Sequence, residues 1–125
     1  MKKVIMTPDA PKPVGPYSQA VLADQTLYCS GQIAIDPVTN EVLKGSVQEE
    51  AELVMKNIGA VLKESGMNYE NIIKTTIFLI NMSDFGTVNE VYGKYFKASP
   101  PARSTIAVKE LPKGVQVEIE VVAYL

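Results

Sequence analysis

The clearest pattern of apolar and polar positions in the chain lies between Ser46 and Ser65. Apolar residues recur there every three or four positions, at Ala51, Val54, Met55, Ile58, Val61 and Leu62. This spacing places them on one face of an α-helix. Ser46 and Glu49 have the spacing of a capping box, and Gly66 is suited to end the helix. The pattern therefore predicts one long amphipathic helix over 46–65.

A second helical pattern runs from residue 83 to residue 98, with either Ser83 or Asp84 as its N-cap. Its apolar stripe consists of Phe85, Val88, Tyr92, Tyr95 and Phe96. Strands are predicted where apolar residues run continuously or alternate with polar ones, at 2–6, 18–23, 27–35, 72–80, 102–108 and 115–124. Four prolines between Pro8 and Pro16 exclude regular structure from that segment.

The predicted order β-β-β-α-β-α-β-β is typical of an α/β (α+β) fold in two layers, a mixed sheet with two helices on one face. Asp24 and Gln25 should form the turn of an antiparallel hairpin, and the strands on either side of the second helix should be parallel. Segment 72–80 is apolar on both faces, which indicates a central strand. We expect residues 1–125 to form one domain with a single core.

Both faces of this predicted sheet carry apolar residues. They are Ile33, Ile35, Ile77 and Leu79 on one side, opposed by Ala34, Phe78 and Ile80 on the other. A single helical layer covers only one face, so the other face needs a partner. The pattern therefore predicts a homo-oligomer.

The composition narrows the chemistry that the chain can perform. It has no histidine and one cysteine, Cys29, which excludes Ser-His-Asp and Cys-His catalysis and a thiolate zinc site. Cys29 lies in an apolar strand, so we interpret it as a small core residue and not as a nucleophile. We expect no metal and no tightly bound cofactor.

The charge and the ends of the chain bear on its partners and its location. The net charge is −2 and no cluster of lysine and arginine is present, which argues against nucleic-acid binding. A single cysteine fits a reducing compartment. Neither a signal peptide nor a membrane span is visible, so we expect a cytoplasmic protein with no membrane partner.

Arg103 is the only arginine in the chain. A guanidinium grips a carboxylate or a phosphate through two parallel hydrogen bonds, which a lysine cannot do. Two prolines precede it and a predicted strand follows, so its side chain should stand on a rigid element. The pattern fits a small anion site, and it fits an arginine paired with a carboxylate at a subunit contact equally well.

The last predicted strand alternates in polarity. Its apolar side consists of Val115, Val117, Ile119 and Val121, and its polar side of Gln116, Glu118 and Glu120. On an edge strand such glutamates are usually solvated. The alternative is that one of them polarises a water molecule as a general base, a role worth about 10²–10⁴ in rate.

Several other residues are open to a functional or a structural interpretation. Tyr17 follows a Gly-Pro turn, and its hydroxyl either donates to an anion or a water or simply packs at the strand entry. Gly31 interrupts a strand, which marks a bulge or a close approach by a ligand. Asn89 borders the apolar stripe of the second helix. Lys109 and Lys113 are most simply solvated.

Six clusters along the chain resemble one family in combination. They are Gly15-Pro16-Tyr17-Ser18-Gln19-Ala20, Ser30-Gly31-Gln32-Ile33, Asn57-Ile58, Val88-Asn89 with Tyr92, Pro101-Ala102-Arg103-Ser104, and Leu111-Pro112-Lys113-Gly114-Val115 with Glu118-Ile119-Glu120. Each cluster alone is a weak signal. At these spacings, and over essentially all 125 residues, the chain resembles the RidA-type reactive-intermediate (enamine/imine) deaminases.

The resemblance implies a chorismate-mutase-like fold and a homotrimer. The sheets of such a trimer pack into a central barrel, and its active sites lie in the clefts between subunits. It also implies cofactor-free hydrolysis of 2-imino acids, such as 2-iminopropanoate and 2-iminobutanoate, to 2-oxo acids and ammonia.

The family's functional residues fall on particular positions of this chain. Its carboxylate-binding arginine falls on Arg103, and its water-activating glutamate on Glu118 and not Glu120. Its pocket positions fall on Tyr17, Ser30, Gly31 and Asn89. Thr105 stands where many members have a cysteine, and it should line the same pocket because it shares a strand face with Arg103.

Three other functions remain open at this point. The Arg103 pocket would serve a non-catalytic sensor of small 2-oxo or carboxylic acids as well as an enzyme. An RNA-cleaving translation inhibitor is also conceivable for this family, although the acidic balance disfavours it. In a chaperone-like trimer the cleft would be incidental.

Overall fold

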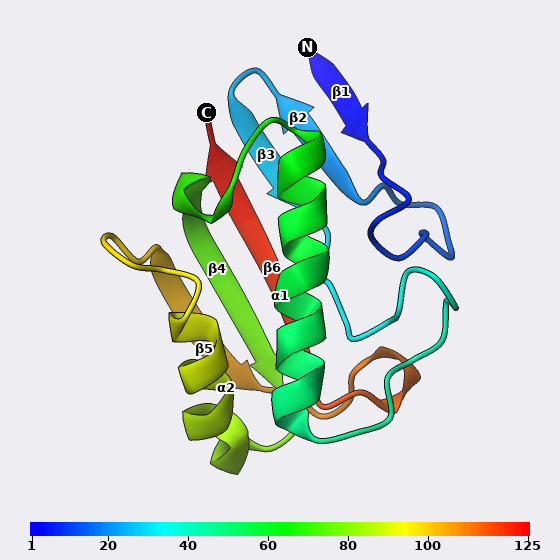
Figure 1. The fold of residues 1–125 in the computed structure, drawn as a ribbon, viewed down its shortest axis with the longest axis vertical. Coiled ribbons are helices and arrows are strands. Elements are labelled where there is room, and N and C mark those ends of the chain that lie inside the picture. The colour runs from blue at the N-terminus through cyan, green and yellow to red at the C-terminus, as the bar shows by residue number, and fades with distance from the viewer.

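A computed structural model describes residues 1–125, which form a six-stranded sheet and two α-helices (Figure 1). The strands are β1 (Lys2–Ile5), β2 (Ala20–Ala23), β3 (Thr26–Cys29), β4 (Ile72–Leu79), β5 (Ala102–Ala107) and β6 (Val117–Tyr124). The helices are α1 (Val47–Glu64) and α2 (Phe85–Gly93). Three short 3-10 helices lie at Tyr69–Asn71, Met82–Asp84 and Pro112–Gly114.

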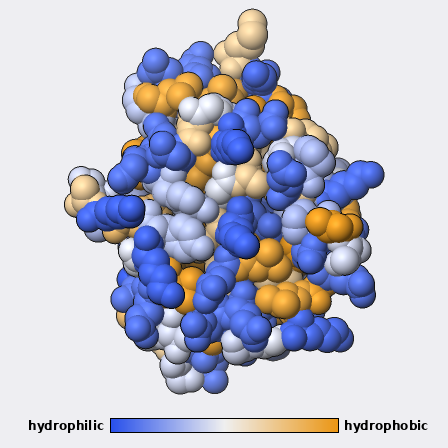
Figure 2. Space-filling view, viewed as in Figure 1, coloured by the Kyte–Doolittle hydropathy of each residue, from blue (hydrophilic) through white to orange (hydrophobic).

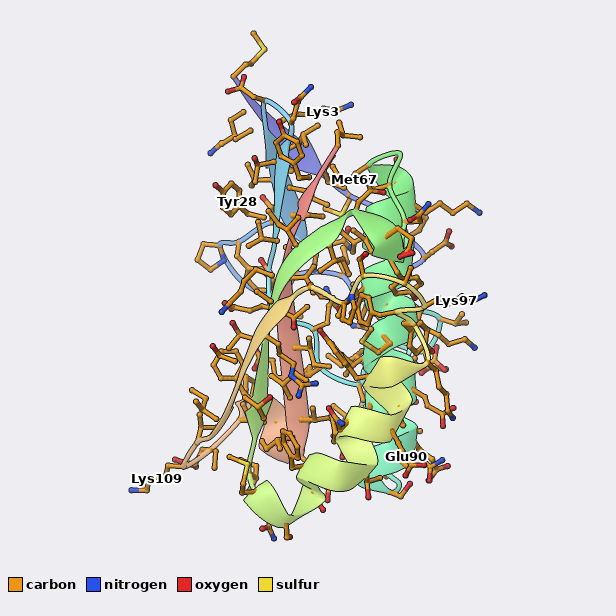
Figure 3. The ribbon with its side chains drawn as sticks, turned by 90° about the vertical axis from the view of Figure 1, so that its left-hand side faces the viewer. Lys3, Tyr28, Met67, Glu90, Lys97 and Lys109 are labelled. Carbon is orange, nitrogen blue, oxygen red and sulfur yellow. The ribbon has the colours of Figure 1, made fainter.

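The sheet is mixed, with the order β1-β2-β3-β6-β4-β5. β4 and β5 are parallel and are connected through α2, whereas all other neighbours are antiparallel. Asp24, at a φ of 55°, turns the chain between β2 and β3 as predicted. Both helices lie on one side of the sheet (Figures 1 and 3). The two-layer architecture expected from the sequence is therefore confirmed.

The ends of α1 form as the sequence predicts. The Ser46 hydroxyl accepts from the Glu49 amide at 3.1 Å, and the Glu49 carboxylate accepts from the Ser46 amide at 2.9 Å. At the other end Gly66 takes a φ of 74°, and the Met67 amide donates to the Leu62 carbonyl at 2.9 Å. This Schellman arrangement uses a backbone conformation that glycine adopts without strain.

The core lies between α1, α2 and the sheet. Its apolar side chains from α1 are the six predicted ones, and they pack against β6 through Val117, Ile119, Val121 and Ala123. β6 lies between β3 and β4, so it is an interior strand and the case of solvated glutamates on an edge strand does not apply to it. Glu118 is half-buried on this strand, whereas Glu120 is exposed.

The predicted strand over 27–35 ends at Cys29. Beyond it the chain makes only isolated bridges, from Gln32 to Ile119 and from Ile35 to Val42. The Ser30 hydroxyl donates to the Ser18 carbonyl at 2.6 Å, so the chain is drawn out of line with β6 before pairing resumes. The sequence marked this place through Gly31, interpreted as a bulge or a close approach, but it did not reveal the contact with the distant Ser18.

The second helix is shorter than predicted. It ends at Gly93, a poor helix former, and not at residue 98. Asp84 occupies its N-cap position, as one of the two predicted candidates, but its side chain makes no capping hydrogen bond. Asn81 accepts from the Ser83 amide at 3.2 Å and caps the 3-10 turn that precedes the helix. Phe96 still packs on Tyr92, with ring centroids 4.7 Å apart, although it lies outside the helix.

The side of the sheet away from the helices, called the open face below, carries exposed apolar residues. Cross-strand partners on it include Val4, Val21, Tyr28, Val122, Phe78, Glu118 and Ile106. Tyr28, which is 54% exposed, points away from the helices (Figure 3). In contrast, the outer surface of the molecule on the α1 side is largely hydrophilic with small apolar groups (Figure 2).

The apolar residues predicted on the second face of the sheet are only partly found there. Ile33, Ala34 and Ile35 lie outside the strands and do not form a sheet face. Phe78 and the residues around it on the open face do leave apolar surface without a partner in the chain. The homo-oligomer stays a prediction.

Candidate active site

Arg103 projects from β5 towards α2. Its register partner on β4 is Thr75, a buried residue whose hydroxyl lies 2.7 Å from the Tyr92 hydroxyl. The Arg103 guanidinium carbon lies 5.0 Å from the centre of the Tyr92 ring and 5.5 Å from that of Phe85. One Arg103 nitrogen, Nη1, donates to Asn89 Oδ1 at 2.6 Å. Two aromatic rings and one amide therefore hold the guanidinium in place.

No carboxylate of the chain neutralises Arg103. The single ion pair in the structure joins the Met1 amino group to Asp24 at 3.7 Å. Asn89 orients the guanidinium without cancelling its charge, since an amide oxygen is neutral. The position thus presents a half-buried, fixed and uncompensated positive charge, which is suited to bind a small anion.

Thr105 lies on the same side of β5 as Arg103, two residues further along. Both line a small depression between β4, β5 and α2, together with Ile77, Leu79, Phe85, Val88 and Asn89. The Thr105 hydroxyl oxygen is buried there and has no hydrogen-bond partner. The depression combines an apolar wall with one charged and two polar groups.

Glu118 lies on the open face, on the other side of the sheet from Arg103. It pairs with Phe78 of β4, and its carboxylate lies over Gly31 so closely that a Cβ atom at Gly31 would overlap it. The missing side chain at Gly31 therefore makes room for a carboxylate of the same chain. Burial raises the pKa of Glu118, and the charge of Glu120 raises this pKa further.

Two other expected pocket residues are Ser30, the chain neighbour of Gly31, and Tyr17, the neighbour of Ser18, which contacts Ser30. The Ser30 hydroxyl is already engaged with the Ser18 carbonyl at 2.6 Å, which fixes the backbone beside Gly31. Tyr17, the neighbour of Ser18, is 52% exposed, and its hydroxyl has no hydrogen-bond partner in the chain. Tyr17 is therefore free to meet a ligand or a second copy of the chain.

The expected site residues thus fall into two clusters. The Arg103 cluster, with Asn89 and Thr105, lies on the helix side of the sheet. The Glu118 cluster, with Gly31 and Ser30, lies on the open face. The structure does not bring Arg103 and Glu118 into one pocket of a single chain, because β4 separates their strands and their side chains leave the sheet on opposite faces.

Sequence reasoning missed the aromatic support of Arg103. It assigned Phe85 and Tyr92 only to the apolar stripe of the second helix. Their spacing from Asn89, four residues before it and three after it, places all three on one helix face. An asparagine between two aromatic residues at helical spacing is the signal that could have found this arrangement.

Cys29 is the single thiol of the chain. Burial raises the pKa of Cys29 to about 12, as befits a core residue and not a nucleophile. No three side chains of His, Cys, Asp or Glu gather in a way that would hold a metal ion. Neither helix has both the length and the apolar character that crossing a membrane requires.

The structure is that of a small α+β protein with a single arginine that is held in place and has no ion-pair partner. The family model described as endoribonuclease L-PSP matches residues 7–125, and the chain belongs to this family, also called the RidA family. The mouse and human proteins named 2-iminobutanoate/2-iminopropanoate deaminase are each 50% identical to it over 123 residues. The match covers 98% of this chain and 91% and 90% of those relatives.

Solved structures agree with the fold. RidA from the Antarctic bacterium Psychrobacter sp. PAMC 21119 is 40% identical, with a TM-score of 0.95 over 98% of this chain and 99% of that one. E. coli TdcF with bound serine is also 40% identical, with a TM-score of 0.94 over 98% of both chains. These similarities confirm the fold class that the sequence resemblance implies.

Proposed function

We propose that the protein hydrolyses reactive 2-imino acids, such as 2-iminopropanoate and 2-iminobutanoate, to 2-oxo acids and ammonium. The observation that carries the proposal is the uncompensated guanidinium of Arg103, held by Asn89 and two aromatic rings. A 2-imino acid offers a carboxylate to this charge. Relatives half identical over nearly the whole chain bear the name of this activity.

Glu118 supplies the proton chemistry in this proposal. A raised pKa makes the Glu118 carboxylate a stronger base than an ordinary glutamate, so it takes a proton from water more readily and can still give it to a more basic nitrogen. Its place over Gly31, with Glu120 exposed beside it on the same strand face, singles out Glu118 from the two glutamates. A water molecule on its exposed side would be held next to the substrate.

The two clusters meet only if two copies of the chain combine. Arg103 and Glu118 leave opposite faces of one sheet, so a substrate held by Arg103 of one copy requires Glu118 of another. The apolar open face, where Tyr28 and Ile106 are about half exposed, gives the copies a reason to associate. A homotrimer with a site in each cleft between subunits satisfies both requirements.

The reaction then follows from charge and position. Arg103 binds the substrate carboxylate, which fixes the protonated imine carbon beside the water. The water oxygen bonds to this carbon while Glu118 takes one water proton, and a carbinolamine forms. Glu118 returns the proton to nitrogen. The C–N bond then breaks, the hydroxyl proton passes to the departing ammonia, and the 2-oxo acid and ammonium leave.

Such a site needs neither histidine nor a strong nucleophile. A protonated imine is already electrophilic, so the enzyme has to hold the carbon and the water together and to move one proton. Positioning in a well-oriented site and general-base assistance both contribute to the rate. Free backbone groups also help, because β5 has a single neighbour in the sheet and one of its edges is unpaired in the chain.

The test is the decay of enzymatically generated 2-iminopropanoate with and without the protein. Wild type should accelerate the decay. Arg103→Ala should abolish the acceleration, and Glu118→Gln should lower it by about 10²-fold or more. Glu120→Gln is the matched control. It removes a neighbouring carboxylate that contributes only the smaller part of the raised pKa of Glu118, so it should lower the rate far less than Glu118→Gln.

A carboxylate sensor is the second candidate. The solved structure of E. coli TdcF holds serine, which is an amino acid with a free carboxylate. A sensor would bind 2-oxobutanoate through Arg103 but would not accelerate imine decay, and Glu118→Gln would leave binding unchanged. Binding without turnover would therefore mean that the protein is a sensor and not a deaminase.

RNA cleavage is a third candidate, because the family model is described as an endoribonuclease, and it has a separate test. A chain with a net charge of −2 and a single arginine lacks the clustered cations that phosphate backbones require. RNA binding that weakens steeply with salt would speak for this activity. Cleavage that survives Arg103→Ala would place it outside the site described here.

A further inference from the structure

The Thr105 hydroxyl is the one buried side-chain polar atom in the structure without a hydrogen-bond partner. Buried polar groups are almost always paired, because an unpaired one loses its bonds to water and gains nothing in return. The side chains around it in the depression are mostly apolar, namely Ile77, Leu79, Phe85 and Val88. None of them can accept or donate a hydrogen bond.

A valine would fill the same space in the strand without this cost. It has the shape of threonine with a methyl group in place of the hydroxyl, and its propensity for strands is equally high. A hydroxyl that destabilises the ligand-free protein at this position is explained if a ligand uses it. Hydroxyl groups on the exposed surface carry no such cost, because they form hydrogen bonds with water.

The group most suited to pair with Thr105 is the anion that Arg103 binds. The two residues are two positions apart on one strand face, and both line the same depression. A carboxylate has two oxygens and about four acceptor sites, so one oxygen facing the guanidinium leaves another to accept from a hydroxyl. Hydrogen bonds to a charged acceptor are about twice as strong as neutral ones.

We propose that the Thr105 hydroxyl is a second donor to the substrate carboxylate, and that it determines how tightly this chain holds 2-oxo and 2-imino acids. The inference rests on the proposed function, because it takes Arg103 to be the carboxylate site. It adds a residue whose side chain, and not its backbone, selects the ligand.

The depression has no room for a ligand as it stands, so the proposal requires side chains to move. Phe85, which is 39% exposed, and Arg103 both line it. A single hydrogen bond, to Asn89, ties the guanidinium to the protein. In the proposal an arriving carboxylate competes for this bond, and Arg103 turns towards the ligand so that the hydroxyl can be reached.

The experiment compares two variants that keep the shape of the strand. Thr105→Val removes the hydroxyl and keeps the volume, whereas Thr105→Ser keeps the hydroxyl and removes a methyl group. Binding of 2-oxobutanoate, the stable product analogue, is measured by calorimetry for wild type, both variants and Arg103→Ala. Thermal unfolding of each protein is recorded without ligand.

Two effects of opposite sign are expected for Thr105→Val. Its dissociation constant for 2-oxobutanoate should rise about tenfold or more, as the loss of a hydrogen bond to a charged group implies. Its unfolding temperature without ligand should equal or exceed that of wild type, because an unpaired buried hydroxyl has been removed. Thr105→Ser should bind within about threefold of wild type.

The outcomes separate this inference from the proposed function. If wild type binds 2-oxobutanoate and Arg103→Ala does not, but Thr105→Val binds within twofold of wild type, the role of the hydroxyl is refuted while the site stands. An equal loss in Thr105→Ser and Thr105→Val refutes it as well. If Arg103→Ala binds like wild type, the carboxylate site itself is wrong, and the role of Thr105 falls with it.

A double-mutant cycle decides whether the two residues touch the same carboxylate. In that case the loss of affinity in Arg103→Lys/Thr105→Val should differ from the sum of the two single losses. Additive losses would mean that Thr105 acts elsewhere on the ligand, which contradicts the inference.

Discussion

Arg103 and Glu118 lie two strands apart in one sheet and project from its opposite faces. Arg103, whose register partner on β4 is Thr75, faces α2. Glu118, whose register partner on β4 is Phe78, faces away from the helices. Each residue has its own local support, and neither needs the other to keep its position. The separation means that the electrostatic environment of Glu118 can be tested without reference to the anion site.

The stability of the protein should depend on the protonation of Glu118. Its pKa in the folded protein is raised, so the folded state holds this proton more tightly than the unfolded chain does. The contribution to stability is fully present below about pH 4.3, the ordinary pKa of a glutamate, and is lost as the pH rises through the folded value. Glu118→Gln should therefore unfold at a higher temperature than wild type at pH 8.

The pH series supplies the check on this prediction. The gain in unfolding temperature from Glu118→Gln should shrink as the pH falls towards 4, about the ordinary pKa of a glutamate. Glu120→Gln is the control, and it should give a smaller gain with less dependence on pH. A Glu118→Gln variant that is less stable than wild type at pH 8 would show that the carboxylate is stabilising and that burial is not its main influence.

Gly31→Ala should disturb function more than stability. The added Cβ meets the carboxylate end of Glu118, which can swing away because it is the far end of a flexible side chain. The free energy of unfolding should fall by only about 1 kcal/mol or less. Because Glu118 is displaced, imine hydrolysis should fall nearly as far as in Glu118→Gln. Gly93→Ala, where the added Cβ meets nothing within 4 Å, is the control.

A double variant shows whether Gly31 acts through Glu118. If it does, Gly31→Ala/Glu118→Gln should be no slower than Glu118→Gln alone, since residues that act as a unit are not additive. A further drop on adding Gly31→Ala would mean that the glycine serves the substrate directly. In that case Gly31 would be a point of close approach by a ligand, which is one of the two interpretations made from the sequence.

Gln19 should be among the most costly polar residues to replace. It is 1% exposed, and its amide accepts from the Thr7 amide at 2.7 Å and donates to the carbonyls of Thr7, Ala10 and Pro11. Each buried group left unpaired costs about 1–3 kcal/mol, so Gln19→Leu should lose at least about 3 kcal/mol. Chemical denaturation measures the loss.

The local consequence of Gln19→Leu distinguishes this role from general damage. The proline-rich segment over 8–16 should become sensitive to limited proteolysis, because Gln19 alone ties its first half to the sheet by side-chain bonds. Gln48→Leu on the exposed side of α1 is the matched control and should change neither property. Equal stability of Gln19→Leu and wild type would contradict the role.

The local signals in the sequence predicted local structure well. The capping box at Ser46, the turn at Asp24 and the alternation of β6 depend on residues a few positions apart, and all three occur as expected. The break after Cys29 depends on Ser18 and Glu118, which are distant in sequence. Gly31 marked the place as a bulge or a close approach, but the segment does not tell which distant residues contact it.

The site shows the same limit more clearly. The sequence places Arg103 and Thr105 on one strand face, because a strand alternates with a period of two. The sequence does not say whether Glu118 lies on the same face as these two residues, because this depends on the register of β4 against both β5 and β6. The unpaired state of the Thr105 hydroxyl likewise depends on packing across α2.

The separation of Arg103 and Glu118 leads to a test of the site between copies. Arg103→Ala and Glu118→Gln should each be nearly inactive alone. When they are unfolded together and refolded as a mixture, some clefts should combine the intact Arg103 of one variant with the intact Glu118 of the other. Random assembly of equal amounts into closed rings gives about a quarter of the clefts this composition, so about a quarter of wild-type activity should return.

A second mixture makes the test quantitative. Wild type is refolded with equal amounts of the double variant Arg103→Ala/Glu118→Gln. If each cleft draws on two copies, about a quarter of the clefts are intact, whereas a site within one chain leaves about half of them intact. Recovery in the first mixture together with a quarter in the second supports the two-copy site. No recovery in the first and half in the second would mean that Arg103 and Glu118 of one chain act together, which requires a rearrangement of the sheet that separates them.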